Sequence, residues 1–278
     1  SQPMGFYAPA QLVQDARRHK VEVRGVDVRF SDWESTLERT SSDDPAVRLG
    51  LHQVKGLSRA GGDQLVQARL RSAFSDVEDL AHRVQLNRKD LDALASAGAL
   101  EGLSGHRHHA RWAVAGIETP LPLLEDTPPI EAEPLLRRPT EGEDIVADYA
   151  SLGLTLRRHP LALLRARLNQ SRYLSAEAVR SCANGKLVRT AGLVICRQHP
   201  SSASGVIFIT LEDETGQTNL VIWPKLVERQ RREVLHAGLL AVVGEVQKEG
   251  EVLHVIAHRL IDETALLGNL IVASRDFR

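Results

Sequence analysis

The chain has 278 residues, with 35 Lys and Arg against 36 Asp and Glu, and therefore a formal net charge of −1. At roughly 100–200 residues per domain this length predicts two domains, and 42% apolar residues exclude wholesale disorder. The sequence has no run of about 18 apolar residues and no signal-like start, so we expect neither a membrane span nor a secretory signal. Two cysteines, Cys182 and Cys196, cannot build a disulfide scaffold, so we expect a reducing cytoplasm.

The near-zero net charge is the sum of opposed blocks. Residues 118–148 hold two basic and nine acidic side chains, a net of −7, and residues 149–191 hold eight and one, a net of +7. The acidic block also contains six of the 12 prolines, which disfavour helix, so we expect an extended linker there. This linker is either a solvated spacer or a segment that competes with DNA for the neighbouring basic block.

The first part of the chain predicts short elements. Residues 9–20 place apolar side chains at helical spacing, and residues 21–31 alternate with the period of a strand. Short helices broken by glycines follow from Val47 onward. We expect Ser75, three residues before Glu78, to cap one helix in a capping box, and Asn87 to cap the next.

Two small-residue turns separate these helices, at Gly56-Leu57-Ser58 and at Ala97-Gly98-Ala99. A tight glycine turn exposes backbone N–H groups at a helix N-terminus, where the helix dipole favours a phosphate. Such a pair is typical of tandem helix-hairpin-helix units, which hold the DNA backbone without reading bases. Ser58 stands where the commoner turn has a second glycine and the second unit is degenerate, so any glycine-capped helical bundle remains the alternative.

The basic block follows the linker as a helical connector over residues 149–185, with Leu161, Leu164 and Leu168 on one face. Its charge is either an ordinary solvated helix face or a phosphate-facing surface. The candidate basic-surface residues are Arg157, Arg158, Arg165 and Arg167.

Residues 186–265 predict three strands, one helix over residues 225–238 and two further strands, the layout of a five-stranded OB-fold barrel. Alternation points Ile207, Ile209, Leu211, Leu220 and Ile222 into the barrel. An outward Phe208 can stack on a base, worth about 1–3 kcal/mol, or can pack against a neighbouring domain. The outward candidates for single-strand contact are Phe208, Thr210, Asn219 and Trp223.

Several segments resemble, in chain order, the C-terminal part of bacterial C-family DNA polymerases, most closely the error-prone, damage-induced branch. The end of the chain soon after the OB segment also favours that branch, because the main replicative subunits carry a further domain there. The segments are QPMGFYAPAQLVQDARRHKVEVRGVDV (2–28), VRLGLHQVKGL (47–57), LASAGAL (94–100), SLGLTLRRHPLALLR (151–165), FITLEDETG (208–216) and SRDFR (274–278).

The resemblance implies an α+β multidomain chain. Residues 1–50 resemble the end of the fingers, residues 51–117 the tandem helix-hairpin-helix domain that holds duplex DNA, and residues 186–265 the OB domain that faces single-stranded template. The linker (118–148), the connector (149–185) and a C-terminal tail (266–278) complete the division. FITLEDETG followed by NLVIWP also resembles the anticodon-binding OB domains of aspartyl-type tRNA synthetases, which makes Phe208 and Asn219 the leading single-strand contacts.

The resemblance further implies a polymerase that extends a primer past damage. Its catalytic carboxylates, which hold two Mg²⁺ ions, belong to a palm domain that this sequence does not contain. We therefore expect a fragment that is inactive alone, with no catalytic residue, metal or cofactor of its own. The implied partners are primer–template DNA, the rest of the polymerase chain, accessory lesion-bypass proteins and the sliding clamp, with no membrane.

For duplex phosphates we expect contacts from the two glycine turns. Leu57 has core packing as its alternative role, and Lys55 and Arg59 have a solvated surface. His106, His108 and His109 have poor spacing for zinc, so we expect a surface loop there, or a basic loop beside DNA. A protein-binding OB adaptor and a tRNA-binding module remain as rival functions. The candidate duplex contacts are Lys55, Gly56, Leu57, Ser58, Arg59 and Gly98.

Overall fold

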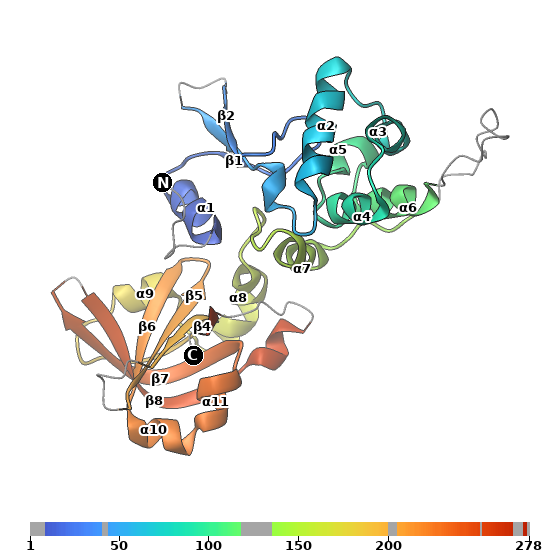
Figure 1. The fold of residues 1–278 in the computed structure, drawn as a ribbon. Helices are drawn as coiled ribbons and strands as arrows, with labels where there is room; N and C mark the ends of the chain where they lie inside the picture. Colours follow the sequence, from blue (N-terminus) through green and yellow to red (C-terminus); the bar gives the residue numbers. More distant parts are fainter. Residues whose placement is uncertain are drawn as a thin grey trace. The chain divides into compact units, whose positions relative to one another are not determined.

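The computed structural model describes residues 9–40, 44–117, 135–199, 205–250 and 252–268, and a short strand at residues 275–276. Eleven α-helices occur in these ranges (Figure 1). The chain divides into two compact units, Ser1–Leu156 and Arg157–Arg278. Each unit is described by itself below.

Unit 1 begins with helix α1 (Pro9–Arg18) and a three-stranded sheet of order β1-β3-β2. Strand β1 (Val23–Arg24) runs parallel to β3 (Ala46–Arg48), and β2 (Thr36–Glu38) runs antiparallel to it. The strand expected over residues 21–31 is therefore only two residues long. The reason is a turn that starts at Asp27, whose carboxylate accepts a hydrogen bond from the backbone N–H of Arg29 (2.9 Å).

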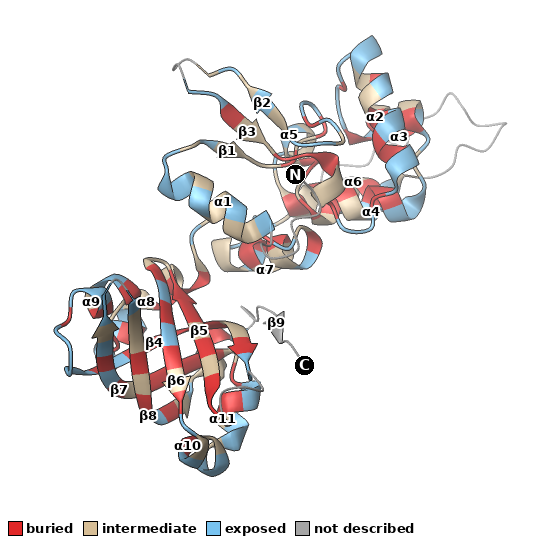
Figure 2. Cartoon of the chain, turned by 60° about the vertical axis from the view of Figure 1, so that its left-hand side comes forward, coloured by how far each residue is buried: buried red, intermediate tan, exposed pale blue. Residues whose placement is uncertain are grey.

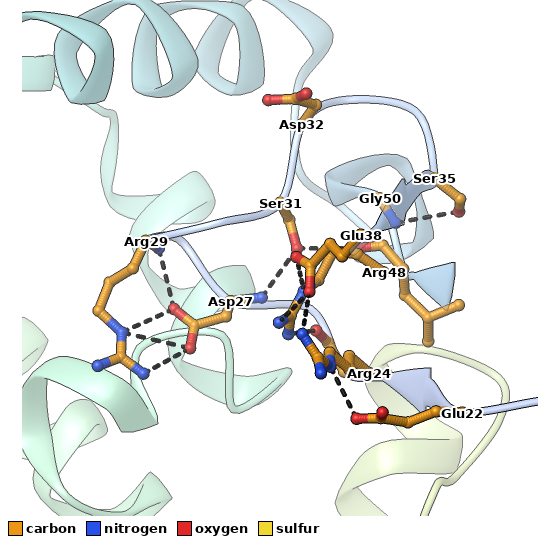
Figure 3. Close-up of polar contacts among 12 residues, drawn as sticks. Glu22, Arg24, Asp27, Arg29, Ser31, Asp32, Ser35, Glu38, Arg48 and Gly50 are labelled. Carbon is orange, nitrogen blue, oxygen red and sulfur yellow. Dashed lines mark hydrogen bonds and ion pairs between the residues drawn. The ribbon is translucent and has the colours of Figure 1, made fainter. Parts of the chain in front are cut away.

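Glu38 ties the three short strands together (Figure 3). It accepts hydrogen bonds from Arg24 of β1 (2.7 Å) and from Arg48 of β3 (2.7 and 3.0 Å). Arg48 also donates to the carbonyl of Gly25 (2.9 Å). The hydrogen bond from Arg48, and then that from Arg24, hold the pKa of Glu38 below its usual range, so the carboxylate stays charged.

Six further helices of unit 1 follow a short 3₁₀ turn at Leu51–Gln53, and the first five of them, α2 to α6, pack around one core. The side chains of Leu65, Leu80, Leu94 and Leu100 are fully buried in it. Because strand and loop residues such as Val28 and Leu49 join the same core, the unit does not divide at residue 50 as the sequence predicted. The helices are α2 (Arg59–Arg71), α3 (Val77–Val84), α4 (Arg88–Ser96), α5 (Glu101–Ser104), α6 (Arg107–Gly116) and α7 (Glu141–Ser151).

Two N-caps in this unit were predicted from the sequence. Asn87 caps α4 by accepting a hydrogen bond from the N–H of Asp90 (2.9 Å), as expected. The predicted cap of α3 is wrong by one residue, because Asp76 rather than Ser75 accepts from the N–H of Asp79 (2.8 Å). Ser75 lies one position earlier and donates its own N–H to the Asp79 carboxylate (3.1 Å).

Helix α7 begins inside the segment that the sequence predicted as an extended linker. Residues 118–134, which hold most of the linker prolines, lie outside the described residues. Beyond Pro139, Thr140 and Glu143 form a capping box that starts the helix, and no further proline interrupts it. The acidic residues of 141–148 are therefore helical.

Unit 2 is a barrel preceded by helices α8 (Pro160–Gln170) and α9 (Ala176–Arg180). The strand order is β5-β6-β8-β7-β4, and pairing of β5 with β4 closes the barrel. A further strand, β9 (Arg275–Asp276), pairs with β4, and a 3₁₀ turn lies at Thr264–Leu267. The barrel strands are β4 (Leu187–Gln198), β5 (Ile207–Asp213), β6 (Gly216–Ile222), β7 (Leu239–Glu249) and β8 (Val252–Asp262).

Alternation along the strands fills the barrel as predicted. The side chains of Ile207, Ile209, Leu211, Leu220 and Ile222 are all buried within it. Figure 2 shows buried positions along the barrel strands. The single helix expected over residues 225–238 is two short helices, α10 (Pro224–Arg229) and α11 (Arg231–His236). The break falls at Gln230, whose side-chain amide both donates to and accepts from the backbone of Leu260 at 2.8 Å.

Candidate nucleic-acid interfaces

The Gly56 turn presents backbone donors at the start of α2. Gly56 has φ +90°, a conformation that glycine tolerates without strain, and Leu57 is buried beneath it. Ser58 caps the helix by accepting from the N–H of Gly61 (3.0 Å). The preceding N–H groups, of Arg59 and Ala60, have no acceptor within the helix, and both residues are exposed. This arrangement suits an anion at the helix N-terminus.

A buried carboxylate that was not among the predicted site residues holds this turn in place. Asp90 of α4 is 2% exposed and accepts from the N–H and the hydroxyl of Ser58, both at 2.8 Å. It also accepts from the side chain of Asn87 (2.8 Å). The Ser58 hydroxyl thus donates to Asp90 while accepting from Gly61, a pair of bonds that a glycine at position 58 could not make.

The cations of the turn already have partners within unit 1. The Lys55 ammonium donates to the carbonyls of Tyr149 (2.9 Å) and Ala150 (3.1 Å) at the end of α7. Arg59 bonds Asp63 (2.9 and 3.0 Å) and lies 5.0 Å from the centre of the Trp33 ring. Lys55 is nevertheless exposed, and 62% of the Arg59 side chain is exposed, so both face solvent beside the turn.

Two glycines in the first turns of α2 allow Trp33 and Asp90 to approach closely. A Cβ at Gly62 would lie 2.4 Å from the Trp33 ring, and one at Gly61 would lie 2.8 Å from the Asp90 carboxylate. Adjacent glycines inside a helix weaken it, so their presence is a sequence signal for such a contact.

The Gly98 turn has a different environment. Gly98 has φ +73°, but the N–H groups of Ala97, Gly98 and Ala99 all bond carbonyls at the end of α4. A Cβ at Gly98 would lie 2.8 Å from the Glu101 carboxylate and 2.9 Å from the Arg107 guanidinium. The second turn is therefore a closed helix C-cap rather than an open donor site.

Arg107 covers that second turn and joins α6 to α7. Its side chain is 5% exposed and bonds Asp144 and Asp148, each at 2.5 Å. Both carboxylates come from the acidic block, so these acids pair with the helical domain. Arg107 Nε is buried without a hydrogen-bond partner among the described residues, so the contacts of the guanidinium with carboxylates are made by its two terminal nitrogens.

The three histidines lie at the start of α6 rather than in a loop. His106 is the N-cap residue and accepts from the N–H of His109 (3.3 Å), and His108 contacts the carbonyl of Arg137 (2.7 Å). Burial, followed by the charge of His109, lowers the pKa of His106. Among the residues that the structure describes, no group of three His, Cys, Asp or Glu side chains could hold a metal ion.

The basic connector is partly engaged with the barrel of unit 2. Arg165 bonds Glu214 (2.5 and 2.9 Å) and Asp213 (3.1 Å) in the β5–β6 turn, and only 18% of its side chain is exposed. The hydrogen bond that Arg165 donates to Glu214 raises the pKa of Arg165, which stays protonated. Arg157 is half-buried, whereas Arg158 and Arg167 are exposed. Arg165 thus fastens α8 to the barrel, and Arg158 and Arg167 are the better-placed surface cations.

The four predicted single-strand contacts lie on the outer face of β5 and β6 or just beyond it. Phe208 pairs across the strands with Val221, and Thr210 pairs with Asn219. The Thr210 hydroxyl donates to Asn219 Oδ1 (3.0 Å), and Asn219 is exposed. Trp223 follows β6 as the N-cap residue of α10 and is 53% exposed. Two aromatic side chains and an amide therefore share one region of the barrel surface.

Two family models match these regions. A helix-hairpin-helix motif matches residues 20–110, and an OB-fold nucleic acid binding domain matches residues 188–262. The first match begins just before the sheet of unit 1 and includes it, in agreement with the single core there. The class of protein that fold and site define is a nucleic-acid-binding α+β chain, in which a helix-hairpin-helix region precedes an OB barrel, and the expected fold class is confirmed.

Along its whole length the chain is similar to proteins named error-prone DNA polymerase. It is 57% identical over 277 residues to that of Alkalilimnicola ehrlichii and 52% identical over 296 residues to that of Methylococcus capsulatus. The alignments cover 100% of this chain but 27% and 28% of those relatives, so the chain spans just over a quarter of their length. The resemblance expected from the sequence is confirmed.

Similarity to solved structures is much weaker. Asparaginyl-tRNA synthetase from Pyrococcus horikoshii aligns with 37% of this chain and 24% of that chain, at 21% identity and a TM-score of 0.30. A TM-score this low does not establish a shared fold. In the described part of the chain, no helix is long and apolar enough to cross a membrane.

Proposed function

We propose that this chain is the DNA-handling portion of an error-prone DNA-directed DNA polymerase that acts in translesion synthesis and damage-induced mutagenesis. The observation that carries the proposal is the identity of 47–57% over the whole chain to proteins of that name. Nucleotidyl transfer, and the Mg²⁺ ions that it requires, are assigned to the rest of the polymerase. The sliding clamp and accessory lesion-bypass proteins are proposed partners of the whole enzyme.

Within this portion the two units divide the DNA between them. The Gly56 turn of unit 1 binds a duplex phosphate through the exposed N–H groups of Arg59 and Ala60, with Lys55 and Arg59 as flanking cations. The outer face of β5 and β6 binds single-stranded template, with Phe208 as the stacking residue. The low cysteine content, with only Cys182 and Cys196 in 278 residues, is compatible with the proposed cytoplasmic location.

The proposal is tested by binding of the whole chain to a primer–template junction at several salt concentrations. Because bound phosphates release counterions, we expect the affinity to fall steeply as salt rises. Salt-independent or absent binding would instead favour a protein-binding adaptor. Preference for an RNA loop over the DNA junction would favour a tRNA-binding module.

The division of labour is tested with two variants. Phe208→Ala weakens binding to single strands by about tenfold, the loss of one base–aromatic stack, and leaves duplex binding intact. Lys55→Ala with Arg59→Ala weakens duplex binding and reduces its salt dependence, but leaves single-strand binding intact.

Matched controls accompany both variants. Leu187→Ala removes an exposed apolar side chain from β4 of the same barrel, and Arg18→Ala with Arg71→Ala removes two exposed cations away from the turn. We expect Leu187→Ala to leave single-strand affinity unchanged, and the double arginine control to leave duplex affinity unchanged. If the two test variants weaken both substrates equally, the proposed division is wrong.

A further inference from the structure

The outer face of the barrel extends over a third strand, β8. Strand β6 pairs in parallel with β8, so that Asn219 lies opposite His254 and Val221 lies opposite Ile256. Val255 and Ala257 are buried in the barrel, which places His254 and Ile256 on its outer face. Neither residue could be assigned to this face from the sequence, because the β6–β8 pairing joins segments about 35 residues apart.

Two parallel rows of side chains therefore cross three neighbouring strands. An apolar row consists of Phe208, Val221 and Ile256. A polar row consists of Thr210, Asn219 and His254, one step of two residues further along the strands. Such a step is about 6.6 Å, so a base that stacks on the first row has its edge within reach of the second.

The leucines of helix α8 do not pack against the two rows. Helix α8 packs its leucines against Ala191 and Leu193 of β4 and Leu239 and Ala241 of β7. The rows lie over β5, β6 and β8 instead, where Asn219 is exposed and the other five side chains are half-buried. A partner that reaches β5, β6 and β8 thus meets side chains of both rows.

The hydrogen bonds of the polar row set which atoms face outward. Because the Thr210 hydroxyl occupies Asn219 Oδ1, the amide presents its Nδ2 donor. The His254 ring has no hydrogen-bond partner among the described residues, and its Nδ1 is buried. We assign the ring proton to Nε2, where a ligand can accept it, because a protonated Nδ1 would be a buried donor without an acceptor. Two unpaired donors thus lie side by side on adjacent strands.

We propose that Thr210, Asn219 and His254 form a base-reading row, with His254 as a contact residue and Thr210 as the positioning residue of the Asn219 amide. The inference rests on the proposed single-strand function of the barrel. Two neighbouring donors favour bases with keto oxygens, such as thymine with O2 and O4. They disfavour adenine, whose exocyclic amino group is itself a donor. The row therefore confers a preference for thymine over adenine at the base stacked on Phe208.

The experiment measures the affinities of the whole chain for oligo-dT and oligo-dA, and compares their ratio between variants. Thr210→Val keeps the shape of the side chain but removes the hydroxyl that bonds the Asn219 amide. His254→Phe keeps a ring but removes the donor. Each substitution lowers the dT-to-dA affinity ratio about three- to tenfold, the worth of one hydrogen bond. Gln247→Leu, an exposed side chain on β7 that pairs with His254, is the control and leaves the ratio unchanged.

A purely structural role predicts a different result, because a loosened barrel weakens both oligonucleotides equally. An unchanged ratio in both variants, with single-strand binding still dependent on Phe208, would overturn the base-reading row and leave the proposed function standing. Failure of the unmodified chain to bind either oligonucleotide would instead refute the single-strand function itself.

Discussion

The Gly56 and Gly98 turns share a backbone conformation but differ in what surrounds them. Both glycines have positive φ, +90° and +73°. An added Cβ would meet its nearest neighbours at 3.9 Å and 4.0 Å at Gly56, but at 2.8 Å and 2.9 Å at Gly98. The first turn is open to solvent, whereas Glu101 and Arg107 cover the second. A small-residue turn between helices thus predicts backbone geometry, but its neighbours decide whether a phosphate can reach it.

The second turn is a structural joint. Its N–H groups bond to carbonyls of α4. The Arg107 side chain, which covers the turn, donates to two carboxylates of α7. We infer that α7 contributes to the stability of the helical domain through this joint, and that only the first turn contributes to DNA binding. The predictions below test this difference, in order of decreasing effect.

Arg107→Met should cause the largest loss. It leaves Asp144 and Asp148 buried without their guanidinium, which costs about 3–5 kcal/mol of unfolding free energy. This loss is measured by urea denaturation, from the unfolding transition of unit 1. Arg111→Met, on the exposed side of the same helix, is the control and should change stability by less than about 0.5 kcal/mol. A loss below about 1 kcal/mol for Arg107→Met would show that this joint does not stabilise the helical domain.

Gly98→Ala and Gly56→Ala separate the two turns directly. Both force alanine into a positive φ, which costs about 1–2 kcal/mol, and the crowded Gly98 site adds to this. We expect Gly98→Ala to destabilise the fold more, yet to leave duplex affinity unchanged under conditions where the protein is folded. Gly56→Ala should be milder in urea denaturation but should weaken duplex binding. Equal effects on duplex affinity would show that the turns are equivalent.

The smallest expected effect is a pH dependence at the start of α7. The hydrogen bond from Arg137, followed by that from the Thr140 N–H, lowers the pKa of Glu143 to about 2. Because the folded pKa is below the unfolded value of about 4.3, this stabilisation is complete above pH about 4.3 and is lost as the pH falls toward about 2. Glu143→Gln should flatten the melting temperature of unit 1 over that range. A curve parallel to that of the unmodified chain would contradict this role.

The barrel was predictable from the sequence because the pattern that indicates each strand lies within that strand. The period-two alternation assigned Ile209, Leu220 and the other inward residues correctly. Both glycine turns could also be located, since positive φ selects glycine. The break at Gln230 could not, because it depends on a side chain that bonds the backbone of β8 thirty residues away.

The chemistry of the sites was less predictable than their positions. Lys55 and Arg59 were chosen for their charge, but their internal partners at the end of α7 and on α2 come from folding. Asp90 and His254 were not singled out, because a lone Asp on a helix or His on a strand carries no pattern. What gives each of them a role is a neighbour brought close by tertiary structure, Ser58 in one case and Asn219 in the other.

The strand order of the barrel also has a kinetic consequence. The first strand, β4, must pair with both β5 and β7, and β6 must wait for β8, the last of the five to leave the ribosome. The barrel therefore has no closed intermediate before residue 262 is made, whereas α2 to α6 meet neighbours close in sequence. We expect unit 2 to fold more slowly than unit 1, and its unpaired strands to be the main source of aggregation during synthesis.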